Sequence, residues 1–231
     1  MLNSFKTALK RFAAQEILEP IQGDIREIIY ERLFDTHCRR LGVSNDFYPI
    51  GSAANYSLML LLLRILDEFP LGSIVELGSG QSTILIDRLR PESSKHVCFE
   101  DDRIWHERLK PTLRRCDYRL SPLVQMDDGQ SYFEAYADLS PQPTELLLVD
   151  GPVGVHAMSR YGCIPFARDS CKADFVIIVD DVNRAAEAGI ADQLERTLGK
   201  TNDGLVSRAI VGSKSQRVIA AGRFAPVIYL W

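Results

Sequence analysis

A glycine-rich turn and an acid further along the chain form the first pattern that indicates a binding site. Residues 76–83 read ELGSGQST, with Gly78 and Gly80 between a β-type apolar run and an amphipathic stretch. Such glycines let the backbone turn sharply and approach a ligand, and the helix that follows offers free N–H groups. Glu100 ends the next β-type run, twenty residues after Gly80. That spacing is typical of a carboxylate that binds ribose hydroxyls, so the pattern predicts a nucleoside site.

Three aspartates form a second pattern. Asp150 follows an apolar run that ends at Val149, and Asp180 and Asp181 follow the run Phe175–Val179. Neighbouring strand ends in a parallel sheet lie about 5 Å apart, so these carboxylates should crowd together and repel. A cation would relieve the repulsion, and oxygen ligands select Mg²⁺, Ca²⁺ or Mn²⁺. The alternative is that the aspartates cap loops or hydrogen-bond a substrate.

The elements that must hold these residues alternate between strands and helices. Short apolar runs at residues 73–77, 95–100, 117–120, 145–149 and 175–179 predict strands, with helices between most of them. Continuous apolar runs suit parallel strands that are covered on both faces. Two last strands, Leu205–Val211 and Arg217–Ala221, are too close in sequence for a crossover helix. The expected fold is therefore α/β: a doubly wound, mostly parallel seven-stranded Rossmann-like sheet with a C-terminal antiparallel hairpin.

The first part of the chain has a helical pattern. We expect a helical N-terminal extension over residues 1–70 and the ligand-binding domain over residues 71–231. Ala53–Phe69 is apolar almost all round and predicts a buried helix. Apolar residues also recur at helical spacing before it, at Leu2, Phe5, Leu9 and Phe12, and at Ile25, Ile28, Ile29 and Leu33. The first of these faces is expected to dock on its own domain, with a membrane or a partner as alternatives, and the N-terminal helices predict a homo-oligomer.

Composition limits the other partners. The 27 basic and 31 acidic residues give a net charge of −4, which does not favour nucleic acid. The five cysteines are odd in number and contain no C-x-x-C pair, which suits a reducing cytoplasm. No apolar run reaches the roughly 20 residues that span a bilayer, and the N-terminus lacks the apolar core of a signal peptide.

Together these motifs resemble the class I S-adenosylmethionine-dependent methyltransferases over about residues 50–221. The matching segments are VELGSGQST, CFEDD, LLVDGP, IIVDD and the terminal hairpin. NAD would require a third glycine where Thr83 stands. The resemblance implies that the glycine-rich turn holds the methionine part of S-adenosylmethionine and that Glu100 holds its ribose. The candidate cofactor-binding residues are Glu76, Gly78, Ser79, Gly80, Ser82, Glu100 and Asp101. Asp101 is either a second contact or the cap of the next helix.

The aspartates resemble the Mg²⁺ ligands of metal-dependent O-methyltransferases, including the catechol and sugar enzymes. The resemblance implies a metal on Asp150, Asp180 and Asp181. Two departures are a shorter glycine-rich turn and the absence of a lysine just after Asp150, where the catechol enzymes have their base. Asp150 and His156 are the candidate catalytic residues, because an imidazole near this edge titrates in the range needed to accept a hydroxyl proton. Arg160 and Arg184 either bind an anionic group of the substrate or pair with the aspartates.

The implied function is methyl transfer to an oxygen of a small-molecule or sugar-like acceptor. The segment from Phe47 to Tyr56 is expected to form part of the acceptor wall. One alternative is a non-catalytic module that binds S-adenosylmethionine, and another is a metal-free methyltransferase acting on a different nucleophile. A glycosyltransferase that uses Asp180 and Asp181 for Mn²⁺ would leave the glycine-rich turn unexplained.

Overall fold

The computed structural model describes residues 19–49, 53–127, 129, 131–154, 156 and 158–230. The predicted face of Leu2, Phe5, Leu9 and Phe12 lies outside these ranges, as do Ile50, Gly51 and Ser52 of the expected acceptor wall. Within these ranges, no helix combines the length and the hydropathy needed to cross a membrane.

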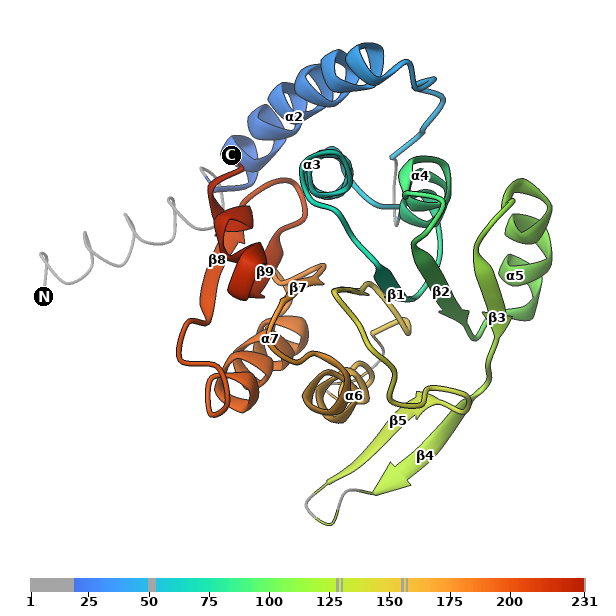
Figure 1. The fold of residues 1–231 in the computed structure, drawn as a ribbon, viewed down its shortest axis with the longest axis vertical. Helices are drawn as coiled ribbons and strands as arrows, with labels where there is room; N and C mark the ends of the chain where they lie inside the picture. The colour runs from blue at the N-terminus through green and yellow to red at the C-terminus, as the bar shows by residue number, and fades with distance from the viewer. Residues whose placement is uncertain are drawn as a thin grey trace, which may run out of the picture.

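A seven-stranded sheet forms the centre of the molecule, with the strand order β3-β2-β1-β6-β7-β9-β8 (Figure 1). β9 runs antiparallel to both of its neighbours, and the other pairs are parallel. This arrangement confirms the predicted mostly parallel sheet with a terminal hairpin. The strands are β1 (Ser73–Leu77), β2 (Lys95–Glu100), β3 (Asp117–Leu120), β6 (Leu146–Val149), β7 (Phe175–Val179), β8 (Val206–Ile210) and β9 (Gln216–Ala221).

The order of the strands creates a switch point between β1 and β6. From β1 the chain moves outward through β2 and β3, and it then returns to the other side of β1 as β6. Leu77 and Val149 are register partners at the carboxyl ends of these two strands. The glycine-rich turn and Asp150 therefore leave the sheet side by side, at the position where open α/β sheets bind ligands.

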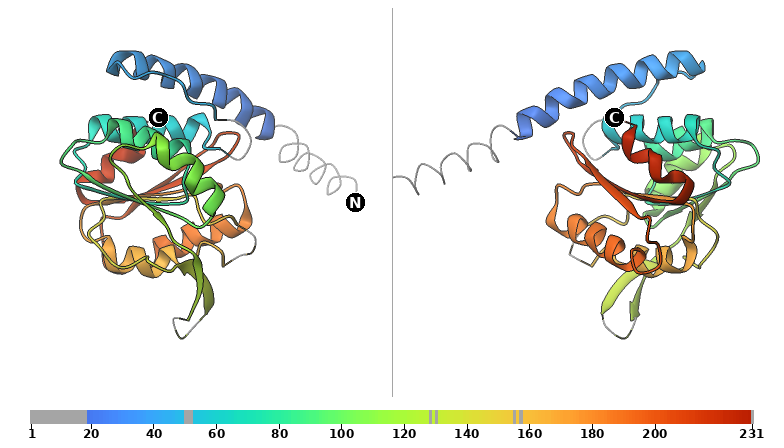
Figure 2. Two further views of the ribbon diagram at one scale, coloured as in Figure 1. Left: turned by 90° about the vertical axis from the view of Figure 1, so that its right-hand side faces the viewer. Right: turned by 60° about the vertical axis from the view of Figure 1, so that its left-hand side comes forward.

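Helices cover both faces of the sheet (Figure 2). The helices α3 (Tyr56–Glu68) and α4 (Gln81–Leu89) pack on one face, and α6 (Cys163–Ser170) and α7 (Ala185–Leu198) pack on the other. Successive residues of β6 point alternately into these two cores, Leu146 and Leu148 into the first and Leu147 and Val149 into the second. Burial on both faces explains why the strands are apolar throughout.

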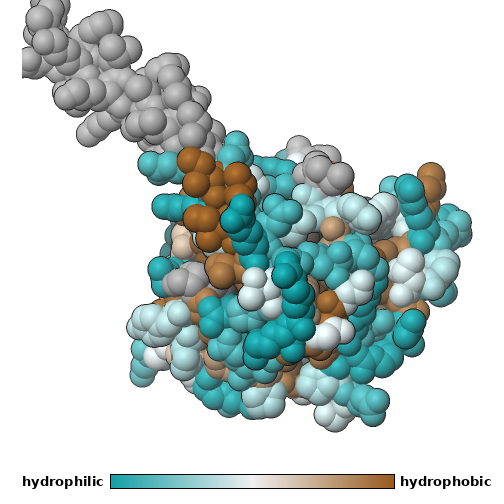
Figure 3. Space-filling model, turned by 90° about the horizontal axis from the view of Figure 1, so that it is seen from above, coloured by the Kyte–Doolittle hydropathy of each residue, from teal (hydrophilic) through white to brown (hydrophobic). Residues whose placement is uncertain are grey.

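The long helix α2 (Glu19–Leu41) lies across the outside of α3 (Figure 1). Its inner face buries Phe34 and Cys38 in the same core as α3. The predicted stripe of Ile25, Ile28, Ile29 and Leu33 instead points outward, and each of these side chains is about half exposed, between 45% and 54%. Figure 3 views the molecule from this side and shows apolar (brown) side chains gathered among hydrophilic (teal) ones. The boundary at residue 70 stays a prediction.

Several elements were not predicted. The strands β4 (Leu123–Asp127) and β5 (Tyr132–Tyr136) form an antiparallel hairpin that projects from the body in Figure 1. Gly129, with a φ of 82°, lies in its turn, and an Asp-Gly pair between alternating runs is a known hairpin signal. The alternation of strands and helices placed a helix between β6 and β7 without giving its bounds, and α6 occupies that position; the final 3₁₀ helix η3 (Gly222–Tyr229) was not predicted. The predicted helix after β2 is α5 (Arg103–Leu109), and the short 3₁₀ helix η2 (Lys110–Thr112) follows it.

Candidate functional site

The turn between β1 and α4 requires glycine at one position and leaves open space at another. Gly78 has a φ of 84°, and a Cβ atom there would lie 2.6 Å from the backbone nitrogen of Gly151. A Cβ atom on Gly80 would meet no atom within 4 Å, and Gly80 lines a cavity. Gly78 therefore lets two strand ends pack closely, whereas Gly80 keeps a wall of the cavity clear.

This difference predicts that one substitution lowers stability and that another removes ligand binding. Gly78→Ala should lower the free energy of unfolding by at least about 1–3 kcal/mol, because an alanine is strained at positive φ and would contact Gly151. Gly80→Val should leave the melting temperature nearly unchanged but abolish ligand binding at the turn, because its side chain would fill the clear space. Thermal melts and calorimetry with S-adenosylhomocysteine on both variants measure these effects. Intact binding by Gly80→Val would show that the ligand lies elsewhere.

Glu76 lies beneath the turn and is fully buried. Its Oε1 accepts a hydrogen bond of 2.6 Å from Ser82 Oγ, and its Oε2 lies 3.1 Å from His96 Nε2. Ser82 and the glycines line the cavity, but Glu76 is not among the lining residues. Glu76 thus supports the start of α4 from below. His96 lies inside β2 and is the buried partner of this acid.

Glu100 at the end of β2 faces the cavity and is 7% exposed. Its Oε2 accepts hydrogen bonds from Ser79 N at 3.2 Å and Ser79 Oγ at 2.5 Å. Its Oε1 accepts a hydrogen bond of 2.9 Å from Asp102 N. A carboxylate oxygen has two lone pairs, so Oε1 keeps acceptor capacity for a ligand hydroxyl. Burial is the main cause that raises the pKa of Glu100.

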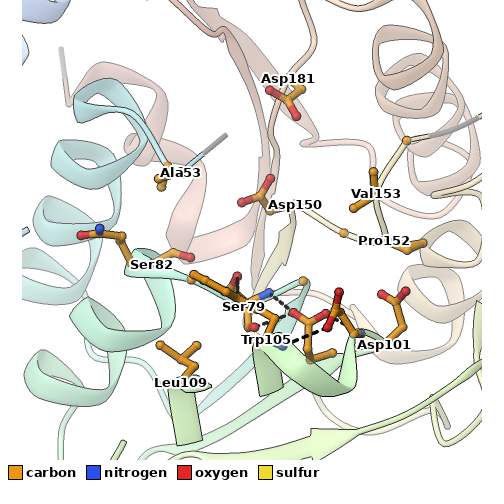
Figure 4. Close-up of a pocket in the computed structure, with 18 of the residues that line it drawn as sticks. Ala53, Ser79, Ser82, Asp101, Trp105, Leu109, Asp150, Pro152, Val153 and Asp181 are labelled. Atoms are coloured by element: carbon orange, nitrogen blue, oxygen red, sulfur yellow. Dashed lines mark hydrogen bonds between the residues drawn. The ribbon is translucent and has the colours of Figure 1, made fainter. Parts of the chain in front are cut away.

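The two acids after Glu100 have different positions. Asp102 is the N-cap of α5, where its Oδ1 accepts a hydrogen bond of 2.9 Å from Trp105 N. Asp101 lines the cavity, as Figure 4 shows, so it has the position expected of a second ligand contact. Trp105 also lines the cavity, and its indole N–H donates to the carbonyl oxygen of Ser79 at 3.0 Å. No pattern in the sequence pointed to this tryptophan.

The three predicted aspartates do come together at the ends of β6 and β7. Asp150, Asp180 and Asp181 each offer an oxygen atom within 4.8 Å of the other two. Asp180 Oδ2 and Asp181 Oδ1 are buried and have no hydrogen-bond partner among the described residues. Asp181 also has a φ of 61°, a strained backbone conformation of the kind that clusters at functional sites. Two buried oxygens without donors are what a bound cation would need, so these residues fit a divalent metal.

Burial and mutual repulsion disfavour the charged forms of this cluster. The pKa of Asp150 is raised to about 8, first by burial and then by the charge of Asp180. The pKa of Asp180 is raised as well, first by burial and then by the charge of Asp181. Both shifts favour a protonated carboxyl group in this cluster when no cation is bound.

Two arginines on loops offset part of the negative charge of the aspartate cluster. Arg160 is 5% exposed, and its Nη2 atom lies 3.3 Å from Asp181 Oδ2 and 3.8 Å from Asp150 Oδ1. Arg184 Nη1 lies 3.1 Å from the same Asp181 oxygen. Of the two roles open to these arginines, the structure shows pairing with the aspartates. Both arginines also line the cavity.

His156 contacts an acid outside the aspartate cluster. Its Nε2 is 3.4 Å from Glu134 Oε2 on β5, and its side chain is 49% exposed. His156 is not among the residues that line the cavity, whereas Asp150 is. Its role as a base remains a prediction.

One cavity of about 820 Å³ connects these parts (Figure 4). Its walls include the glycine-rich turn, Glu100 and Asp101 on one side and Asp150, Asp181 and the two arginines on the other. Tyr48, Ala53 and Ala54 line it as well, and they belong to the segment expected to form an acceptor wall. The cavity therefore has room for a nucleoside ligand and a second small molecule.

Comparison with known proteins identifies the fold. No protein-family model and no curated protein matches the sequence. An O-methyltransferase from Bacillus cereus, solved in complex with S-adenosylhomocysteine, is similar in structure with a TM-score of 0.50 and 15% identity, over 93% of this chain and 97% of that one. A methyltransferase from Geobacter sulfurreducens has a TM-score of 0.50 and 12% identity, over 84% of this chain and 88% of that one. The chain therefore has the Rossmann-like fold of these methyltransferases.

Proposed function

We propose that this protein is a methyltransferase that uses S-adenosylmethionine to methylate an oxygen of a small-molecule or sugar-like acceptor. The observation that carries the proposal is a cavity that joins the glycine-rich turn and Glu100 to Asp150 and Asp181 of the aspartate cluster. A cofactor over the turn would place its sulfonium methyl group between these two sides. The Bacillus cereus enzyme of the same fold, solved with S-adenosylhomocysteine, supports this assignment.

The reaction would be an in-line displacement. The acceptor oxygen forms a bond to the methyl carbon as the carbon–sulfur bond breaks, which leaves S-adenosylhomocysteine and frees the hydroxyl proton. The protein has to align the two reactants and accept that proton. If no metal is bound, Asp150 is the candidate base, because it lines the cavity and burial raises its pKa to about 8.

Asp150, Asp180 and Asp181 are the residues that would hold a Mg²⁺ ion. When bound, such an ion would lower the pKa of an acceptor hydroxyl and orient it. The two buried oxygens without donors support this proposal. The contacts of Arg160 with Asp150 and Asp181 favour the second candidate, a metal-free methyltransferase in which the guanidinium offsets the charge instead.

A small acceptor fits the surroundings better than a nucleic acid does. The net charge is −4, and acids line the cavity. All five cysteines are free, which supports a reducing compartment such as the cytoplasm.

Calorimetry with S-adenosylhomocysteine and with UDP-glucose tests the class of ligand. We expect binding of the first and none of the second. Methyl transfer is then measured with labelled S-adenosylmethionine on a panel of catechols, phenols and glycosides. Binding of S-adenosylhomocysteine without transfer to any acceptor would favour a non-catalytic module, and binding of the nucleotide sugar alone would overturn the proposal.

We also propose that the outer face of α2 joins two copies of the chain. An antiparallel pair of α2 helices about a two-fold axis at Ile29 would place Ile25 of one copy against Leu33 of the other. Such pairing would cover an apolar stripe that is about half exposed in the single chain.

Sedimentation equilibrium tests this pairing. The wild-type protein should have twice its chain mass of 26.0 kDa, and Ile29→Glu should have the mass of one chain because a charge would be buried at the axis. Ile104→Glu is the matched control, because Ile104 is exposed on α5, outside α2. A wild-type protein that stays a monomer at tens of micromolar would rule out the pairing.

A further inference from the structure

A buried hydrogen-bond network connects the N-terminal helices with the aspartate cluster. Its central residue is Gln216, the first residue of β9, which is fully buried. Gln216 Nε2 donates to Asp180 Oδ1 at 2.7 Å and to Asn55 Oδ1 at 3.0 Å. Gln216 Oε1 accepts a hydrogen bond of 2.8 Å from Ser57 Oγ. The amide thus has partners on both of its ends.

The partners of Gln216 are themselves held in place. Asn55 is the N-cap of α3, and its Nδ2 donates to Glu27 Oε1 on α2 at 2.7 Å and to the carbonyl oxygen of Lys214 at 3.0 Å. Glu27 Oε2 accepts from Ser57 N at 3.3 Å. The network therefore crosses from α2 through the start of α3 to the end of β7. Rotating the Gln216 amide by 180° would set its oxygen against two acceptors, so only one orientation is stable.

This orientation has a consequence for Asp180. Its Oδ1 is tied to an N–H donor that cannot turn away, which fixes the rotation of the carboxylate. Oδ2 is the oxygen left buried without a donor among the described residues. Fixed outer contacts of this kind orient metal ligands in proteins and raise affinity for the ion.

We infer that Gln216 is a positioning residue that sets the Asp180 carboxylate for a divalent cation, and that α2 and α3 support it through Asn55 and Glu27. The inference rests on the cation site proposed above. It gives the N-terminal helices a role in the site although neither Gln216 nor Glu27 lines the cavity.

The test replaces Gln216 with methionine, which has a similar shape but no amide. Mn²⁺ affinity, measured by calorimetry on the full chain, should fall about 10–100-fold, the range for lost outer contacts of metal ligands. Affinity for S-adenosylhomocysteine should stay within about twofold, because the network does not touch the glycine-rich turn. Gln193→Met is the matched control. Gln193 lies on α7 and donates to Tyr161 Oη at 3.1 Å, and the loss of this hydrogen bond should leave Mn²⁺ binding unchanged.

Crystal structures of the wild type and of Gln216→Met give a second readout, in which the Asp180 carboxylate should turn in the variant. Wild-type Mn²⁺ affinity in a folded Gln216→Met protein would overturn the inference. If the wild type binds no Mn²⁺, the proposed cation site is wrong. An Asp180 carboxylate with the same orientation in the crystal structures of the wild type and of Gln216→Met would then overturn the positioning role as well. If Gln216→Met does not fold, Asn55→Ser replaces it: serine keeps the helix cap but removes the partner of Gln216, and Mn²⁺ affinity should fall severalfold.

Discussion

Replacing Glu100 with alanine is expected to weaken binding of S-adenosylhomocysteine by about 1.5–3 kcal/mol, the range for a hydrogen bond to a charged group. The structure gives two reasons for a large effect. Glu100 has an Oε1 oxygen with spare acceptor capacity at the cavity, and its Oε2 accepts two hydrogen bonds from Ser79. The substitution would remove the ribose contact and also loosen the turn that holds the methionine part. Calorimetry at fixed pH and salt measures the difference.

Two further variants separate these contributions. Glu100→Gln keeps acceptor capacity on one oxygen but loses the charge, so it should bind with intermediate affinity. Glu107→Ala removes an exposed acid from the neighbouring helix α5 and should bind as the wild type does. Unchanged affinity in a folded Glu100→Ala protein would mean that another acid, with Asp101 the next candidate, holds the ribose.

The sequence predicted the sheet because its strands are buried on both faces. Runs such as Phe175–Val179 have no polar residue and are bounded by turns, so their type and order could be inferred from the chain alone. The β4–β5 hairpin lacks such a continuous buried apolar run, since all residues of β4 but the first are exposed. Helix α6 contains Pro165 and spans only eight residues, too few for a clear helical period.

The site was predictable where its residues lie at strand ends, since strand order brings those ends together. Gly78, Glu100, Asp150 and Asp181 are of this kind, and all four line the cavity. Side chains that reach the site from distant segments give no such signal. Gln216, for example, is 36 residues from Asp180 in sequence, and only the pairing of β9 with β7 brings the two into contact.

The second large effect is expected for Asp181→Asn in the aspartate cluster, and it concerns Mg²⁺ binding. Asparagine tolerates the positive φ of Asp181 better than most other residues, so the substitution removes a charge with little backbone strain. Mg²⁺ affinity should fall at least about tenfold. Two unit charges about 4 Å apart near a protein surface interact by about 4 kcal/mol, and a tenfold change needs only about 1.4 kcal/mol. Affinity for S-adenosylhomocysteine should hardly change.

The arginines add to this effect. Arg160 and Arg184 both contact Asp181 Oδ2, so removal of its charge leaves their positive charges less compensated and repels a cation further. Asp203→Asn, at an exposed position after α7, is the matched control and should bind Mg²⁺ as the wild type does. Turnover on the acceptor that the panel identifies should stop in EDTA and return with added Mg²⁺.

Full turnover in EDTA would rule out an essential metal and leave proton transfer to the side chains. Asp150→Asn and His156→Ala then distinguish the two candidate bases. Asp150 lines the cavity beside Arg160, whereas His156 contacts Glu134 outside the cavity lining, so the geometry predicts that only Asp150→Asn abolishes transfer. Loss of transfer in His156→Ala alone would show that the segment carrying this histidine reaches the acceptor during the reaction.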